Sequence, residues 1–243
     1  MKASERIIWS ADVPTMRALG HGIKQLPKLM IVKIDRAFME NRNPSIVARI
    51  QEDYGVNVFD DAKIIEIPTK MEQIALKHLK YRPWMMNCMA GGVSSRELED
   101  PKTRDGLKRF ACACHSYGTK PCAVTVLTSK TEDVVRQEFG RTAIEQVLYY
   151  VGVLVECGFT DIVCSPLEVP AIRSESAFAK LGFNTPGIVM PGGDTRDQAR
   201  TNTPGAAVEA GSTRLVIGGA LTEGDRLANF QAIVADIELA NTA

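Results

Sequence analysis

The sequence has no excess of charge of either sign and no apolar run long enough to cross a membrane. Its 243 residues carry 29 Lys and Arg against 29 Asp and Glu, so the formal net charge is zero. A general nucleic-acid-binding protein needs a basic face, so this balance predicts no nucleic-acid partner. The longest apolar runs, residues 147–155 and 215–221, are far shorter than the roughly 20 residues of a membrane span. The N-terminal residues also lack the apolar segment of a secretory signal, and we expect a cytoplasmic protein.

Cysteine is scarce, and its spacing is not that of a metal site. The six cysteines are Cys88, Cys112, Cys114, Cys122, Cys157 and Cys164. Cys112 and Cys114 are one residue apart and no matching Cys or His pair follows them, which argues against zinc. Cys122 and Cys164 lie in apolar runs, where a free thiol behaves as a small buried hydrophobe. The sequence therefore predicts reduced thiols and no metal.

Eight short apolar runs, most of them rich in Val and Ile, alternate with helical patterns. Runs of this kind are typical of strands that are buried on both faces. The runs are Ile7–Ala11, Met30–Ile34, Val56–Phe59, Trp84–Cys88, Ala123–Leu127, Asp161–Cys164, Gly187–Met190 and Leu215–Gly218. The amphipathic segments are Thr15–Leu26, Ser45–Asp53, Met71–Leu79, Arg96–Ala113, Thr142–Cys157, Val169–Leu181, Thr203–Ala210 and Arg226–Leu239.

Glycine separates several of these helical patterns from the next apolar run. Gly55, Gly158, Gly182 and Gly211 each stand where a helix ends, a position that favours glycine because φ is positive there. Strands that alternate with helices pair in parallel through right-handed crossovers. Eight such units predict an α/β fold, a (β/α)8 TIM barrel that spans residues 1–243 as a single domain, and such barrels usually have about 250 residues. The alternative is an open doubly wound sheet, which is disfavoured because SADVPT replaces a glycine-rich turn after the first run.

A cluster of alternating charges follows the third run, in the segment VFDDAKIIEIPTK. In a barrel, the chemistry lies at the carboxyl ends of the strands. Asp61 and Lys63 should project to the same side because strand side chains alternate, and Lys33 ends the neighbouring run. With Glu66 these residues form an array in which each charge has an opposite neighbour, and a lysine held protonated there is a proton donor. The alternative is a solvated loop of mixed charges.

Six motifs make the chain recognisable. DAKIIEIP resembles the D-x-K-x-x-D-I-P element of orotidine 5'-phosphate decarboxylases. The other five, each near the end of a predicted strand, are WSADVP, IVKID, AVTVLTS, TPGIVMPGGDTRDQAR and VIGGALTEGD. The resemblance covers nearly the whole chain, and the order of the motifs is that of the family.

The resemblance implies a role for each matching residue. Lys63 would protonate the ring carbon that loses CO2, Asp61 would lie against the departing carboxylate, and Lys33 would hold Asp61 and a ribose hydroxyl. Glu66 matches an acidic residue that reaches into the partner subunit's site. The substrate-binding residues implied are Asp12 (ribose), Thr128 and Ser129 (pyrimidine), Gln198 (base and phosphate), Pro186, Gly218 and Gly219. The family also implies cofactor-free conversion of orotidine 5'-monophosphate to UMP in pyrimidine biosynthesis, by a homodimer with shared active sites.

The phosphate site departs from the family pattern. Val189 and Gly219 occupy the two places where family members carry arginine, and an arginine fork is the natural bidentate partner of a phosphate. The candidates that remain for the phosphate are the side chains of Arg196 and Arg200 and the backbone N–H groups of Gly192, Gly193, Gly218 and Gly219. The alternative for both arginines is a solvent-exposed loop position.

Two other functions stay open at this point. One is a relative of the same barrel superfamily that acts on a sugar phosphate with Mg²⁺, whose ligands would be the acidic residues. The other is a non-catalytic homologue that binds a nucleotide, which the missing arginines favour and which the retained Lys33, Asp61, Lys63 and Gln198 oppose.

Overall fold

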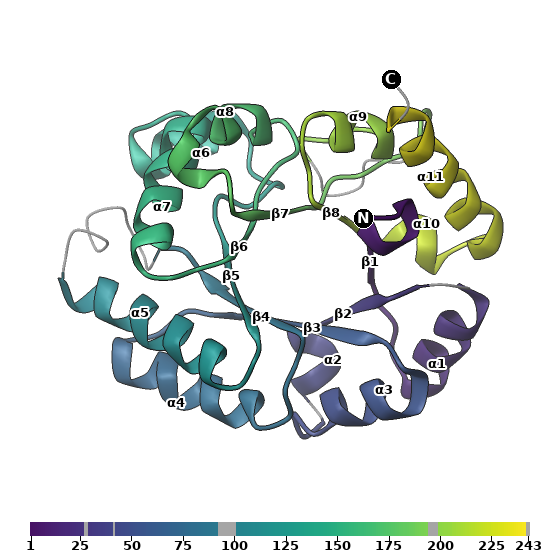
Figure 1. The fold of residues 1–243 in the computed structure, drawn as a ribbon, viewed down its shortest axis with the longest axis horizontal. Helices are drawn as coiled ribbons and strands as arrows, with labels where there is room; N and C mark the ends of the chain where they lie inside the picture. The colour runs from purple at the N-terminus through teal and green to yellow at the C-terminus, as the bar shows by residue number, and fades with distance from the viewer. Residues whose placement is uncertain (27–28, 41, 92–100, 194–198, 242–243) are drawn as a thin grey trace.

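Eight parallel strands close into a barrel in the order β1 to β8, with β8 pairing back onto β1 (Figure 1). The structure is a computed structural model that describes residues 1–26, 29–40, 42–91, 101–193 and 199–241. The strands are β1 (Ile7–Ser10), β2 (Ile31–Asp35), β3 (Asn57–Ile64), β4 (Met85–Met89), β5 (Lys120–Val124), β6 (Asp161–Val163), β7 (Gly182–Thr185) and β8 (Arg214–Ile217). The predicted (β/α)8 TIM barrel is confirmed.

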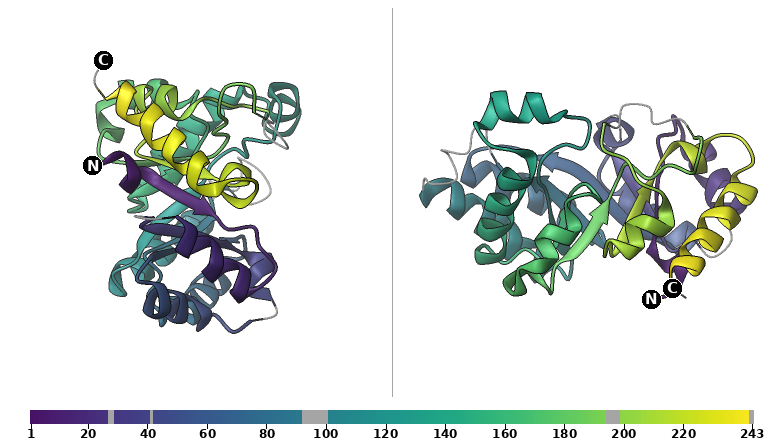
Figure 2. Two further views of the ribbon diagram at one scale, coloured as in Figure 1. Left: turned by 90° about the vertical axis from the view of Figure 1, so that its right-hand side faces the viewer. Right: turned by 90° about the horizontal axis from the view of Figure 1, so that it is seen from above.

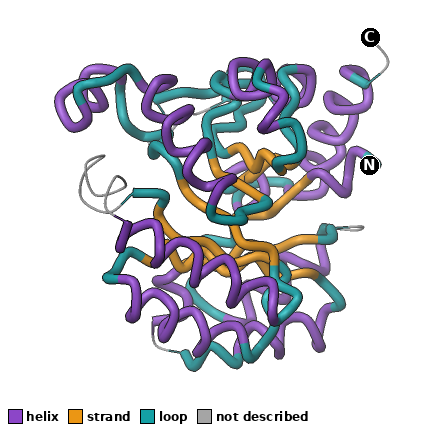
Figure 3. The backbone as a smooth tube through the Cα atoms, turned by 60° about the vertical axis from the view of Figure 1, so that its left-hand side comes forward, coloured by secondary structure: helices purple, strands orange, loops and turns teal. Residues whose placement is uncertain are grey.

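Helices surround the strands on the outside of the barrel, as Figures 2 and 3 show. They are α1 (Met16–Gln25), α2 (Arg36–Glu40), α3 (Ile46–Tyr54), α4 (Pro68–Leu79), α5 (Pro101–Ser116), α6 (Glu132–Phe139), α7 (Ala143–Glu156), α8 (Val169–Ser174), α9 (Pro204–Glu209), α10 (Gly219–Thr222) and α11 (Arg226–Ala240), with 3₁₀ turns at Ala3–Arg6 and Ser176–Phe178. Within the described part of the chain, none of these helices has the length and apolar character to span a membrane.

Side chains alternate between the inside of the barrel and the layer of helices. On β1, Ile8 joins an interior cluster with Ile31 and Phe59, whereas Ile7 and Trp9 pack outward against the helices. All five side chains are buried, so both faces of the strands are covered. This double burial explains why the strands read as continuous apolar runs.

The predicted seventh strand is wrong. Residues 187–190 lie in a loop that has one isolated bridge, from Ile188 to Asn202, and β7 is the more polar segment Gly182–Thr185. Burial of polar side chains is tolerated in β7 because they are hydrogen-bonded. Asn184 Nδ2 donates to Asp161 Oδ1 over 3.2 Å, and the Thr185 hydroxyl donates to Ser212 Oγ over 3.0 Å.

Three of the four predicted glycine caps are confirmed. Gly55, Gly158 and Gly211 have φ of 65°, 86° and 103°. Gly182 does not adopt a positive φ; it begins β7, and a Cβ there would lie 2.2 Å from Asp161 Oδ1. Glycine is required at this position for the close approach of a side chain and not for a turn.

Several predicted boundaries are also wrong. β5 begins at Lys120 instead of Ala123, and β3 continues to Ile64, five residues beyond the predicted end at Phe59. The helix predicted over 169–181 stops at Ser174, and α6 was not predicted at all. Residues 96–100 of the helix predicted over 96–113 lie outside the described residues.

Candidate active site

A cavity of about 700 Å³ opens at the carboxyl ends of the strands. Its floor includes Phe59 and Val216 of the interior cluster and Val163 packed against that cluster. Its walls come from the strand ends and the loops that follow them, which is where barrel enzymes carry their chemistry. Among the described residues that line it, the only cations are Lys33 and Lys63.

Lys33, Asp61 and Lys63 meet in this cavity around one carboxylate oxygen. Asp61 Oδ2 lies 2.5 Å from Lys33 Nζ and 2.7 Å from Lys63 Nζ. The side chains of Asp61 and Lys33 are only 5% and 11% exposed, whereas that of Lys63 is 42% exposed and faces the open cavity. Of the two lysines, Lys63 is therefore the one more open to a bound molecule.

Each charged group of this cluster stabilises the ionised form of its neighbour. Burial by itself would raise the Asp61 pKa, but the ammonium groups of Lys33 and Lys63 outweigh it and hold the pKa well below its ordinary value. Burial would lower the Lys33 pKa, and the adjacent Asp61 carboxylate reverses this and raises it. Asp61 therefore stays ionised and Lys33 protonated at neutral pH.

A bulge in β3 presents Lys63 to the cavity. The pairing of β3 with β4 shifts register between Asp60 and Ile64, and Lys63 has φ of 44°. A residue other than glycine in this left-handed region costs about 1–3 kcal/mol, so surrounding contacts must hold it there. Bulges often re-aim a side chain beside an active site.

Asn87 of β4 provides those contacts. Its Oδ1 accepts a hydrogen bond from the backbone N–H of Lys63 over 2.7 Å, and its Nδ2 donates to Asp61 Oδ1 over 2.6 Å. Asn87 is not among the residues predicted from the sequence. Its place on the fourth run, beside the run that carries Asp61, was the available signal.

Glu66 does not join the cluster within one chain. Its side chain is exposed, and its carboxylate accepts a hydrogen bond from the backbone N–H of Ile67 over 3.2 Å. The side chains of Ile65 and Ile67 on either side of it are 49% and 62% exposed. The predicted four-residue array is thus a three-residue array with Glu66 on the adjoining surface.

Most of the predicted substrate-binding residues line the cavity. These are Asp12, Thr128, Ser129, Pro186, Gly218 and Gly219. Asp12 accepts a hydrogen bond from the Ser10 hydroxyl over 3.4 Å. Gln198 lies outside the described residues.

Only some of the predicted phosphate-site residues line the cavity. Gly193 and the two positions without arginine, Val189 and Gly219, line the cavity, but Gly192 does not. Arg196 lies outside the described residues.

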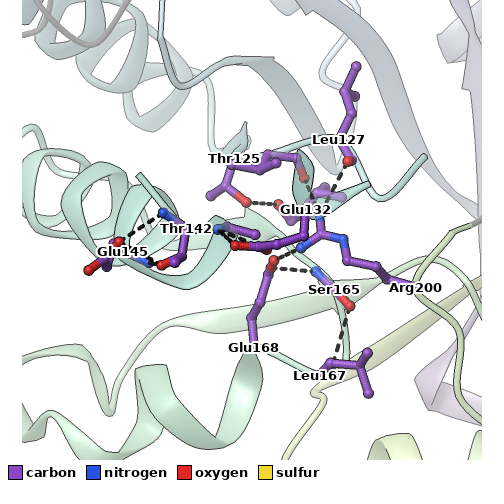
Figure 4. A network of polar contacts seen from close by, with 12 residues as sticks. Thr125, Leu127, Glu132, Thr142, Glu145, Ser165, Leu167, Glu168 and Arg200 are labelled. Atoms are coloured by element: carbon purple, nitrogen blue, oxygen red, sulfur yellow. Dashed lines mark hydrogen bonds and ion pairs between the residues drawn. The ribbon is translucent and has the colours of Figure 1, made fainter. Parts of the chain in front are cut away.

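Arg200 does not line the cavity. It forms a buried ion pair with Glu168, as Figure 4 shows. Their side chains are 13% and 5% exposed. Arg200 Nη2 also donates to the carbonyl of Leu127 over 3.2 Å, and Glu168 accepts from the backbone N–H of Ser165 over 2.8 Å. The pair thus joins the loops that follow β5, β6 and β7. Glu168 is a second residue of this region that was not predicted, and no sequence signal marks it.

The remaining candidates for special chemistry are inert. Burial raises the Cys88 pKa well above its usual value, which keeps this thiol protonated. In the described ranges, no group of three or more His, Cys, Asp or Glu side chains is arranged to hold a metal ion.

Comparison with known proteins agrees with this site. Residues 5–229 match the profile of the Orotidine 5'-phosphate decarboxylase / HUMPS family. The chain is 31% identical to the orotidine 5'-phosphate decarboxylase of Pseudoalteromonas translucida (strain TAC 125), over 96% of each chain. It is 32% identical to that of Moorella thermoacetica (strain ATCC 39073 / JCM 9320), over 98% of this chain and 94% of the relative. The crystal structure of orotidine 5'-phosphate decarboxylase from Lactobacillus acidophilus superposes with a TM-score of 0.76 at 25% identity, covering 96% of this chain and 99% of that one.

Proposed function

The chain belongs to the orotidine 5'-phosphate decarboxylase / HUMPS family, and on that premise we propose that it is a carboxy-lyase that converts orotidine 5'-monophosphate to UMP in pyrimidine biosynthesis. The observation that carries the proposal is the contact of Lys33 and Lys63 with one oxygen of the buried Asp61 carboxylate. This arrangement holds a protonated amine at one point of a partly enclosed cavity, as proton donation to a ring carbon requires.

The proposed reaction needs only the residues of this cluster. The bond between the ring carbon and the carboxylate breaks, CO2 leaves, and the electron pair stays on the ring carbon. The Lys63 ammonium stabilises this growing negative charge and then donates its proton to the carbon, after which the amine regains a proton from water. Asp61 lies beside the substrate carboxylate, so the loss of CO2 removes a contact between like charges.

No metal or organic cofactor has a step in this reaction. Specificity comes from contacts remote from the reacting carbon, and the binding energy of the phosphate is used in the transition state. Asp12 would bind a ribose hydroxyl, and Thr128 and Ser129 would face the pyrimidine.

One observation favours a second candidate, a homologue that binds a nucleotide without turning it over. The part of the cavity formed by Val189 and Gly219 has no cation among the described lining residues, so a phosphate there lacks an arginine fork. Orotidine 5'-monophosphate mixed with the protein and followed by ultraviolet absorbance separates the candidates. Conversion to UMP that persists in excess chelator supports the decarboxylase. Binding without conversion supports the homologue.

We also propose that the protein is a homodimer in which Glu66 contributes to the partner's site. Exposed Ile65 and Ile67 flank Glu66, and exposed apolar side chains beside a functional residue are typical of an interface. A two-fold contact is the commonest oligomer. Sedimentation should show a dimer at micromolar concentration, and Ile67→Arg should shift it toward monomer. Leu239→Arg, at a 71% exposed position near the end of α11, is the matched control that should not. Wild-type protein that stays monomeric with UMP present would contradict the proposal.

A further inference from the structure

Asn87 is a buried amide whose two ends contact two different members of the charged cluster. The residue is 1% exposed. Its oxygen accepts from the backbone N–H of Lys63 and its nitrogen donates to Asp61, at 2.7 and 2.6 Å. Because one partner only donates and the other only accepts, the orientation of the amide is determined by its partners. No step of the proposed reaction uses Asn87.

The contact with Lys63 gives a hydrogen-bond partner to the backbone N–H of the bulge. A bulge leaves its extra residue without a partner in the strand ladder, and a buried N–H without a partner is costly. The Lys63 N–H instead finds the Asn87 oxygen, which supports the positive φ of 44°. The direction in which the Lys63 side chain leaves the strand therefore depends on this amide.

The contact with Asp61 gives its two carboxylate oxygens different partners. Oδ1 accepts from the neutral Asn87 amide, and Oδ2 alone meets the ammonium groups of Lys33 and Lys63. Without Asn87, Oδ1 becomes a free acceptor for either lysine, and the common meeting point of the two ammonium groups is lost.

We propose that Asn87 is a positioning residue that acts through Lys63 and Asp61. It sets the backbone that aims the Lys63 ammonium and the orientation of the carboxylate that holds it. The inference rests on the proposed decarboxylase function, because it assigns Asn87 to the geometry of proton donation. It predicts a defect mainly in turnover, since Asn87 contacts the proton donor and its carboxylate and no residue expected at the phosphate.

Asn87→Ala should lower kcat by about 100-fold or more, because a displacement of about 1 Å at the reacting group has an effect of that size. The KM for orotidine 5'-monophosphate should stay within about threefold, because the interaction that is lost acts in the chemical step. The matched control is Asn184→Ala, which removes an equally buried amide whose partners include Asp161, the carbonyl of Ile162 and Arg214. This control should lose stability and keep its kcat.

Asn87→Asp gives a second readout that a purely structural role would not affect. An aspartate at this position faces the Asp61 carboxylate, and two such carboxyl groups share a proton, which raises the pKa of one of them. When protonated, the new side chain donates to Asp61 as the amide did. The ratio of its kcat to that of the wild type should therefore rise as the pH falls from 8 to 5.

Hydrogen exchange of the Lys63 amide in the ligand-free protein tests the inference without any substrate. Exchange should be at least tenfold faster in Asn87→Ala than in the wild type and unchanged in Asn184→Ala. An Asn87→Ala kcat within twofold of the control, a pH-independent ratio for Asn87→Asp, or unchanged exchange at Lys63 would overturn the inference. If the wild type does not convert orotidine 5'-monophosphate, the proposed function fails, and amide exchange still decides whether Asn87 holds Lys63.

Discussion

Replacement of Arg200 by methionine should destabilise the protein strongly and leave its preference for a phosphate unchanged. Methionine keeps much of the length and volume of the side chain but leaves Glu168 without its cation. The Glu168 side chain is only 5% exposed, and its remaining hydrogen bond comes from the Ser165 N–H. The perturbation therefore creates an uncompensated buried carboxylate.

The expected loss is about 3–5 kcal/mol in the free energy of unfolding, the range for a buried pair broken on one side. With an m-value of about 3 kcal/mol per M, the urea midpoint moves by more than about 1 M. The double variant Arg200→Met, Glu168→Met should recover most of the loss, because a well-packed apolar pair is often as stable as a buried ion pair. Arg49→Met, which breaks the exposed Arg49–Asp53 pair on α3, is the control and should cost about 0.5 kcal/mol or less.

The loss should also depend on pH. Burial raises the Glu168 pKa above its ordinary value even though Arg200 opposes the shift. Loss of the cation raises it further, so the folded state of the variant binds a proton more tightly than the unfolded state does. The destabilisation is then complete above the raised pKa of the folded state and shrinks as the pH falls through it toward the unfolded value of about 4.3. Urea unfolding at pH 8 and pH 5.5 should give a smaller loss at the lower pH.

Titration with UMP and with uridine distinguishes this role of Arg200 from that of a phosphate ligand. If the ion pair persists when a ligand binds, Arg200→Met lowers the affinity for UMP and for uridine by the same factor. A loss confined to UMP, together with a stability change below about 1 kcal/mol, would refute the buried-pair reasoning. It would show that the guanidinium leaves Glu168 for the phosphate.

Three further predictions concern the charged cluster, the phosphate site and the barrel wall. Lys63→Ala should lower kcat by at least about 100-fold while UMP binding in calorimetry persists, because a proton donor acts in the chemical step. A variant that kept a large part of the wild-type kcat would show that Lys63 is not the donor. Gly219→Arg should increase the affinity for UMP about tenfold if roughly 1.4 kcal/mol of binding energy is regained. A titration in which Gly219→Arg blocks UMP binding would mean that the pocket is not built for this phosphate. Gly182→Ala should lower the free energy of unfolding by about 1–3 kcal/mol, since its Cβ would meet Asp161 Oδ1 at 2.2 Å, and an unchanged urea midpoint would contradict this.

The barrel and most of the charged cluster in its cavity follow from local features of the sequence. Strands covered on both faces read as apolar runs, and Gly55, Gly158 and Gly211 end helices at positive φ. Because parallel strands present their carboxyl ends at one edge, the polar residues after these runs were expected to meet. Lys33 and Lys63 do meet there, in contact with Asp61.

Only the tertiary structure decided which buried segments pair and which polar groups satisfy one another. The run 187–190 is more apolar than β7, but Asn184 and Thr185 are stable inside because distant residues accept their hydrogen bonds. Neither the bulge at Lys63 nor the support from Asn87 has a local sequence pattern, since both depend on the register between β3 and β4. The same holds for Arg200, whose acidic partner Glu168 lies 32 residues away in the chain and is brought beside it by the pairing of β6 with β7. Local periodicity determined the elements, and contacts between residues far apart in sequence determined the geometry of the site.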